Sequence, residues 1–185
     1  MSDKKTLFAA IDAQRDTLCS MADQIFDRPE YEGEEVFASG LLTDYLRANG
    51  FEVEMGVGGF KTAFRATYNH GEGGPKLGIL CEYDALRNLG HGCGHHMQGP
   101  GCLGAAVALK NMDCAESFEL IVYGTPAEES FGSKVQMLER GCFKELDVAF
   151  MMHGGPNTCT DVKCLAQKSF NVTFHGKRAH AALAP

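Results

Sequence analysis

Residues 90–96 constrain this chain more than any other stretch, because they gather four potential metal-binding side chains within seven residues. The thiol of Cys93 and the imidazoles of His91, His95 and His96 are interleaved with glycines. Cys and His bind borderline-soft metals such as zinc, and His is also the usual proton carrier near neutral pH. Glycines between such residues let the backbone turn back, so that the side chains can converge. The stretch predicts a metal site, and a flexible loop with one buried thiol is the alternative.

Length and composition limit the size and class of the protein. The 185 residues are 44% hydrophobic, enough to bury the core of one domain or slightly more. A net charge of −7 without a block of like charges argues against nucleic-acid binding and favours a small neutral or cationic substrate. We expect no membrane contact and a cytoplasmic location, since no apolar run reaches spanning length and no signal peptide is visible. The eight cysteines form no Cys-x-x-Cys pair and are read mainly as buried thiols in a reducing compartment.

Hydrophobic periodicity predicts strands that alternate with helices. Helices are predicted over residues 6–26, 34–48, 101–110 and 133–140. Strands are predicted over residues 51–55, 62–68, 76–80, 118–123 and 147–152, and the last three read as buried on both faces. A more exposed, alternating strand is predicted over residues 169–175. This alternation indicates a three-layer α/β domain around a mostly parallel central sheet.

The three buried strands each end in potential ligands or acids, namely Glu82 with Asp84, Glu128 with Glu129, and His153. Sites in open α/β sheets form outside the carboxyl ends of strands, so these groups could meet Cys93 and His95 in one crevice. Of two adjacent carboxylates, one can coordinate a metal ion. Its neighbour can accept a proton from a metal-activated water and pass it to a leaving nitrogen.

A thiol hydrolase is a second interpretation of the same residues. In it, Cys93 is the nucleophile and His95 or His91 is its base. This interpretation leaves the two adjacent glutamates and His153 without a role, so it ranks below a metal site.

At these residues the sequence resembles the dinuclear-metal peptidases of the aminoacylase and carboxypeptidase type. The most similar branch contains hippurate hydrolase, indole-acetyl-amino-acid hydrolases and p-aminobenzoyl-glutamate hydrolase. The matching motifs occur in family order over nearly the whole chain, at residues 82–86, 90–95, 126–129, 153 and 176–182.

The resemblance implies a catalytic site for two divalent metal ions, with zinc or manganese first and cobalt as a further possibility. It implies four metal ligands, namely Cys93, His95, Glu129 and His153. It also implies that Glu128 is the general base, that Asp84 supports the site, and that His180 helps to stabilise the oxyanion.

The resemblance also implies a domain organisation. Residues 1–167 correspond to an incomplete, N-terminal portion of the catalytic domain, and residues 168–185 begin an inserted α+β lid and dimerisation domain. Family members are about twice as long, as expected for a catalytic domain with an insert. The missing half would bring one more histidine ligand. Two smaller departures are Arg87, where the family has proline, and His96, where it has Asp or Asn.

The expected function is that of a metal-dependent amidohydrolase or peptidase. Its substrates are small N-acyl amino acids or dipeptide-like amides, and the complete enzyme is expected to be a homodimer. The alternatives are a truncated, inactive metal-binding remnant and one half of a split enzyme whose C-terminal half is a separate polypeptide.

Overall fold

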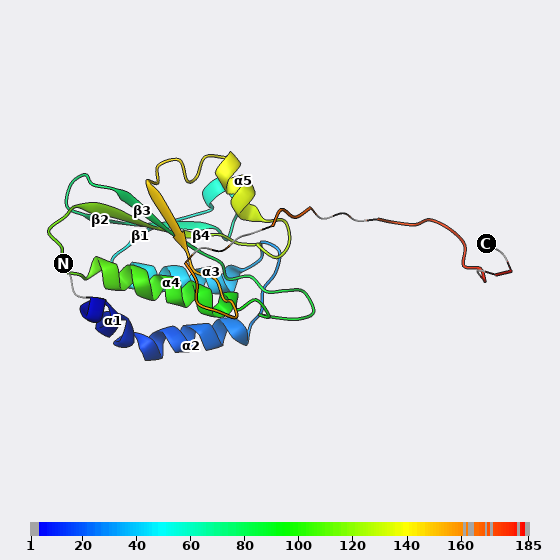
Figure 1. Ribbon diagram of the computed structural model, residues 1–185, viewed down its shortest axis with the longest axis horizontal. Helices are drawn as coiled ribbons and strands as arrows, with labels where there is room; N and C mark the ends of the chain where they lie inside the picture. The colour runs from blue at the N-terminus through cyan, green and yellow to red at the C-terminus, as the bar shows by residue number, and fades with distance from the viewer. Residues whose placement is uncertain are drawn as a thin grey trace. The chain divides into compact units, whose positions relative to one another are not determined.

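The computed structural model describes residues 4–160, 162, 165–168, 170, 172–180 and 182–183. The chain divides into two compact units, Met1–Gly154 and Gly155–Pro185. All the helices and strands of the described residues belong to the first unit (Figure 1). The strand predicted over residues 169–175 is absent from the described residues of that range, and residues 169 and 171 lie outside the description. The predicted domain boundary after residue 167 stays a prediction.

Five strands form one mixed sheet in the order β1-β2-β4-β3-β5. Their bounds are β1 Glu52–Met55, β2 Phe64–His70, β3 Lys76–Cys81, β4 Phe118–Gly124 and β5 Val148–Met151. Strands β4, β3 and β5 are parallel to one another, whereas β1 and β2 continue the sheet in antiparallel pairing. The predicted α/β fold with a sheet that is parallel in its centre is therefore confirmed.

Helices cover both faces of this sheet, as Figure 1 shows. Their bounds are α1 Lys4–Asp12, α2 Arg15–Phe26, α3 Val36–Ala48, α4 His95–Lys110 and α5 Ser133–Glu139, with a 3₁₀ turn η1 at Val57–Gly59. Helices α3 and α4 pack on one face with α1 and α2 beyond them, and α5 lies on the other face. Among the described residues, no helix combines the length and apolar character needed to cross a membrane.

The connections explain why α4 and α5 lie on opposite faces. The chain passes from β3 through α4 to β4, and then from β4 through α5 to β5 on the other side of β3. Because parallel crossovers are right-handed, reversing the direction of travel along the sheet moves the connecting helix to the opposite face. Both crossovers leave from the carboxyl ends of strands, so these ends are where a site can form.

Side chains alternate along β4 between two apolar cores. Leu120 and Val122 point into the larger core beneath α3 and α4, while Ile121 and Tyr123 point into a smaller one with Met137 of α5. All five side chains are fully buried. A strand that is covered on both faces reads as a continuous apolar run, as the sequence predicted for β4.

The single helix predicted over residues 6–26 is wrong, because the chain breaks at Ala13 and Gln14 into α1 and α2. The side-chain amide of Gln14 donates to the carbonyls of Ala10 and, at 3.3 Å, of Gly104 in α4. This contact ties the break to α4. Periodicity could not reveal it, since the apolar spacing continues through the break.

The predicted start of the helix at residue 101 is also wrong, because α4 begins six residues earlier at His95. The run Gly99-Pro100-Gly101 looks like a helix breaker in the sequence. In the structure Gly99 packs against Leu42 and Gly104 against Leu18, where an added Cβ would lie 3.1 and 2.5 Å from a side-chain carbon. Close packing therefore accounts for the small residues.

The prediction that the last strand is buried is wrong. All four residues of β5 are exposed, including Phe150 with a relative exposure of 58% and Met151 with 48%. Strand β5 is an edge strand that pairs only with β3 among the described residues. An apolar run in the sequence does not say what covers it. Here the described residues leave β5 exposed.

Candidate metal centre

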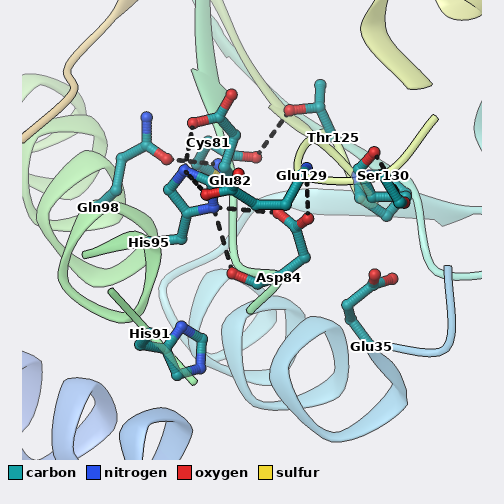
Figure 2. Close-up of polar contacts among 12 residues, drawn as sticks. Glu35, Cys81, Glu82, Asp84, His91, His95, Gln98, Thr125, Glu129 and Ser130 are labelled. Atoms are coloured by element: carbon teal, nitrogen blue, oxygen red, sulfur yellow. Dashed lines mark hydrogen bonds and ion pairs between the residues drawn. The ribbon is translucent and has the colours of Figure 1, made fainter. Parts of the chain in front are cut away.

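The site lies where β3, β4 and β5 end and α4 begins (Figure 2). Glu82 and Asp84 follow β3, the adjacent Glu128 and Glu129 follow β4, and a histidine, His153, follows β5. Because these strands are parallel, their carboxyl ends meet at one edge of the sheet. The first residue of α4, His95, faces the same edge, so side chains from four separate elements converge there.

The buried imidazole of His95 is the centre of the site. It is 1% exposed, and its Nδ1 lies 3.0 Å from Oδ1 of Asp84 and 3.2 Å from the Asp84 carbonyl oxygen. A carboxylate only accepts hydrogen bonds, so Nδ1 carries the proton and Nε2 presents its lone pair. A carboxylate that fixes the tautomer in this way is the usual support for a metal-bound histidine.

The second oxygen of Asp84 holds the turn that carries the paired glutamates. It accepts a hydrogen bond of 2.9 Å from the backbone N–H of Glu129. Just before this pair, the buried Ala127 adopts a left-handed conformation with φ of 55°, which is uncommon for a residue other than glycine. The turn thus brings both glutamates back toward the end of β3, and sequence reasoning missed it because alanine gives no turn signal.

The structure brings the four predicted metal ligands together. One atom each of Cys93, His95 and His153 lies within 4.8 Å of the others. The rings of His95 and His153 meet edge to face with centroids 5.5 Å apart. An oxygen of Glu129 lies 4.0 Å from Nε2 of His95. Their placement agrees with the prediction, while their role as ligands stays a prediction.

Unpartnered atoms show that these residues fit a cation. Nε2 of His95, Oε1 of Glu129 and Oε2 of Glu82 are buried and have no hydrogen-bond partner among the described residues. Burial opposes a charge on His95, but the hydrogen bond to Asp84 and the nearby carboxylates outweigh it and raise the pKa of the imidazole. The site therefore favours positive charge at the point where three ligand atoms lack partners, which suits a divalent ion.

The thiol of Cys93 lies in an environment that opposes its ionisation. Its hydrogen bond to Glu129, its burial and the surrounding carboxylates raise its pKa to about 12. A nucleophilic cysteine needs a lowered pKa, usually from a nearby positive charge. This environment disfavours the thiol-hydrolase interpretation, and a cation beside Cys93 would supply the missing positive charge.

The predicted base, Glu128, belongs to a second group of possible ligand atoms that also includes His95. One oxygen of Glu128 forms a group with Glu82 and His95 whose ligand atoms lie within 4.8 Å of one another. The side chain is half-buried, and its pKa is raised by burial and by the negative charge of Glu82. A raised pKa brings a carboxylate closer to the range in which it exchanges protons at neutral pH.

Of three other residues named in the sequence analysis, one belongs to the second unit and two are in neither group of ligand atoms. His180 belongs to the unit Gly155–Pro185, where its Nδ1 accepts a hydrogen bond from the N–H of Ala182, so its predicted role stays a prediction. Arg87 forms an exposed two-point ion pair with Glu32. The ring of His96 packs beside that of Phe26, and His96 belongs to neither group of ligand atoms.

Sequence reasoning missed two residues that shape the site, namely Gln98 and Lys134, and named Glu82 only as a potential ligand or acid without a role. Gln98 is buried, accepts a hydrogen bond of 2.9 Å from the N–H of Glu82, and donates to the carbonyl of Met152. It therefore links α4 to the ends of both β3 and β5. The sequence placed Glu82 at a strand end and in the motif of residues 82–86, whereas Lys134 gave no signal.

Relatives of known function are similar to this chain over nearly its whole length. The Xaa-Arg dipeptidase of Mus musculus is 34% identical over 98% of this chain and 45% of its own length. A p-aminobenzoyl-glutamate hydrolase chain from Escherichia coli is 34% identical over 95% of this chain and 40% of its own length. The chain thus spans less than half the length of these relatives. No family model matches it.

Solved structures share the fold. A putative aminohydrolase from methicillin-resistant Staphylococcus aureus superimposes with a TM-score of 0.70 over 80% of this chain and 41% of its own. A dinuclear metal binding peptidase from Bacillus subtilis superimposes with a TM-score of 0.68 over 79% of this chain and 44% of its own. Both are 23% identical in sequence to this chain, so they speak to the fold alone.

Proposed function

Because this chain belongs to the family of dinuclear-metal aminoacylase and carboxypeptidase-type peptidases, we propose that the whole protein is a metal-dependent amidohydrolase. It cleaves the amide bond of small N-acyl amino acids or dipeptide-like substrates. The observation that carries this proposal is the convergence of Cys93, Glu129 and His153 on His95, whose Nε2 is unpartnered among the described residues.

In this proposal Cys93, His95, Glu129 and His153 hold divalent metal. A divalent ion supplies a Lewis acid for the amide carbonyl and lowers the pKa of a coordinated water to about 7. The mixed thiolate, imidazole and carboxylate set suits zinc first, while its carboxylate also allows manganese or cobalt. Asp84 orients His95 through Nδ1 and Glu129 through its backbone N–H.

The chain's own residues handle the proton. A carboxylate oxygen of Glu128 takes the proton of the attacking water and returns it to the leaving nitrogen. Its half-buried position and raised pKa support this role. His180 donates to the oxyanion, as the family resemblance implies, and residues 168–185 begin the lid domain from which it acts.

The relatives narrow the choice of substrates to be tried. Their names specify dipeptides that end in arginine and p-aminobenzoyl-glutamate. Both are amides of an amino acid with a free carboxylate, so we propose the same class here.

We also propose a cytoplasmic homodimer. The seven described cysteines are all free thiols, which supports a reducing compartment.

A second candidate is a metal-binding chain that needs a separate polypeptide for turnover. The exposed apolar side chains of β5, led by Phe150 and Met151, support it, because an edge strand of this kind invites a further partner. This candidate predicts bound metal without hydrolysis by the 185-residue chain.

A panel of amides tests the proposal. Purified protein is assayed with hippurate, p-aminobenzoyl-glutamate and alanyl-arginine, before and after treatment with a chelator. We expect hydrolysis of at least one of these amides that stops on metal removal. Hydrolysis that survives complete metal removal would contradict the proposal, and bound metal without hydrolysis would favour the second candidate.

A further inference from the structure

The buried carboxylate of Glu82 has no role in the function described so far. It follows β3 directly and is 1% exposed. One oxygen, Oε1, is paired with the ammonium group of Lys134. The other, Oε2, lies 3.1 Å from Nε2 of His95 and has no hydrogen-bond partner among the described residues. Half of a buried carboxylate is therefore left unsatisfied and faces the centre of the site.

The contact between Glu82 and His95 brings two electron-pair donors together. The proton of His95 is on Nδ1, where Asp84 accepts it, so Nε2 presents a lone pair to the oxygen. Neither atom is hydrogen-bonded within the described part of the chain, although they are only 3.1 Å apart. Two such atoms repel each other in a buried setting unless a cation lies between them, either a proton on Nε2 or a metal ion.

The separation of these two atoms suits ligands of one ion. Nitrogen and oxygen ligands with bonds of about 2.0–2.2 Å to a metal lie about 3.1 Å apart when the bond angle is about 100°. The distance of 3.1 Å between them therefore suits an ion bound by both atoms. Oε1 is occupied by Lys134, so only Oε2 is available.

We propose that Glu82 is a further metal ligand of this site and binds the ion held by His95 through Oε2. This inference rests on the proposed function for the presence of a metal site. It adds a carboxylate that neither the motif resemblance nor the relatives assign. Glu128, which offers one ligand atom to the group that it forms with Glu82 and His95, keeps its role as proton carrier.

The surroundings of Glu82 hold it in the orientation that ligation needs. Its backbone N–H donates to Gln98 of α4 over 2.9 Å, which fixes the end of β3. Lys134, in the first turn of α5, holds Oε1 and turns Oε2 toward His95. The rival explanation is that Glu82 serves only as an ion-pair partner of Lys134 and of a protonated His95, without contact to metal.

Two substitutions separate ligation from the ion pair. Glu82→Gln removes the charged ligand, whereas Lys134→Met breaks the ion pair and leaves Oε2 in place. We expect Glu82→Gln to weaken Co²⁺ and Zn²⁺ binding at least tenfold, measured by competition with a chromogenic chelator, and to change the visible absorption of bound Co²⁺. Lys134→Met loses the orienting contact but keeps the carboxylate, so it should lose less affinity than Glu82→Gln and keep the Co²⁺ spectrum. Glu82→Asp should restore part of the affinity.

Glu35→Gln is the matched control, because Glu35 is equally buried but both of its oxygens accept hydrogen bonds. It should bind Co²⁺ as the wild type does. Unchanged Co²⁺ affinity and spectrum in Glu82→Gln would overturn the inference and leave the proposed function standing. A wild type that binds no divalent metal would overturn both.

A measurement on the wild type covers the case in which Glu82→Gln does not fold. A crystal of the full protein loaded with Zn²⁺ and measured at the zinc absorption edge locates the ion directly. We expect Oε2 of Glu82 at about 2.0–2.2 Å from it, the usual distance for a carboxylate ligand. An ion bound by His95 with Oε2 beyond bonding distance would refute the assignment.

Discussion

The carboxylate of Asp84 accepts a hydrogen bond from Nδ1 of His95 over 3.0 Å and thereby leaves Nε2 as the free nitrogen of a buried ring. The other oxygen of Asp84 accepts the backbone N–H of Glu129 over 2.9 Å. One side chain thus orients two of the predicted metal ligands without being a ligand in either group of ligand atoms. The predicted supporting role of Asp84 has a physical basis in these two contacts.

Asp84→Asn should weaken metal binding about 10- to 100-fold, the usual effect of losing a carboxylate that orients a metal-bound histidine. An amide can donate to Nδ1 as well as accept from it, so the tautomer of His95 is no longer fixed. Metal affinity is measured by competition with a chelator dye, with Glu35→Gln as the control. An Asp84→Asn variant with wild-type affinity would contradict the role of Asp84.

Glu128→Gln and Glu129→Gln should separate proton transfer from metal binding. We expect Glu128→Gln to lower kcat by about 10²- to 10⁴-fold, the usual contribution of a general base, with metal content unchanged. Glu129→Gln should lose metal as well as activity. Metal content by mass spectrometry and kcat are measured on the same samples. Equal loss of metal in both variants would show that the roles are wrongly divided.

Iodoacetamide at neutral pH should leave hydrolysis largely intact. In the active enzyme the Cys93 sulfur is a proposed metal ligand and is shielded from alkylation, and without the ion its pKa is raised to about 12, first by its hydrogen bond to Glu129, so little free thiolate is present in either state. The exposed Cys19 and Cys159 should be modified first. Peptide mass spectrometry identifies the modified residues while activity is followed. Rapid inactivation that parallels modification of Cys93 would support the thiol hydrolase instead.

Glu35→Gln should make stability less dependent on pH. Burial raises the pKa of Glu35 above its ordinary value of 4.5, although hydrogen bonds from Gly33 and Thr62 oppose this. The folded state therefore holds this proton more tightly than the unfolded state. Its contribution to the free energy of unfolding is full below pH 4.5 and declines as pH rises through the raised pKa. Urea unfolding from about pH 4 to 8 should show a less negative slope for the variant, and an identical slope would contradict the assignment.

Much of the site was predictable because the ends of strands can be recognised in the sequence. Apolar runs mark β3 and β4, and the acids that follow them meet at one edge once the strands are parallel. Side chains that lie close together at that edge, such as those of Glu129 and His95, could therefore be expected in one site from the sequence alone. The same reasoning predicted the position of His153 after β5, although not the exposure of that strand.

The remaining features depend on contacts between distant residues. Lys134 pairs with Glu82 across 52 positions of sequence, and Gln98 reaches Met152 across 54. No periodicity or spacing encodes such pairs. The start of α4 at His95 was missed for a related reason. In the sequence, Pro100 and the glycines beside it signal a helix break, and only the packing of Leu42 against Gly99 explains why such residues stand within a helix.

The most direct test of the central claim is a metal-depletion and restoration experiment on the full protein. Bound metal is measured by inductively coupled plasma mass spectrometry while hydrolysis of p-aminobenzoyl-glutamate, hippurate and alanyl-arginine is followed. We predict that dialysis against a chelator removes metal and activity together, and that Zn²⁺, Mn²⁺ or Co²⁺ restores both in proportion. Hydrolysis that persists in the metal-free protein, or protein that never binds a divalent ion, would contradict the assignment of this site as a metal centre.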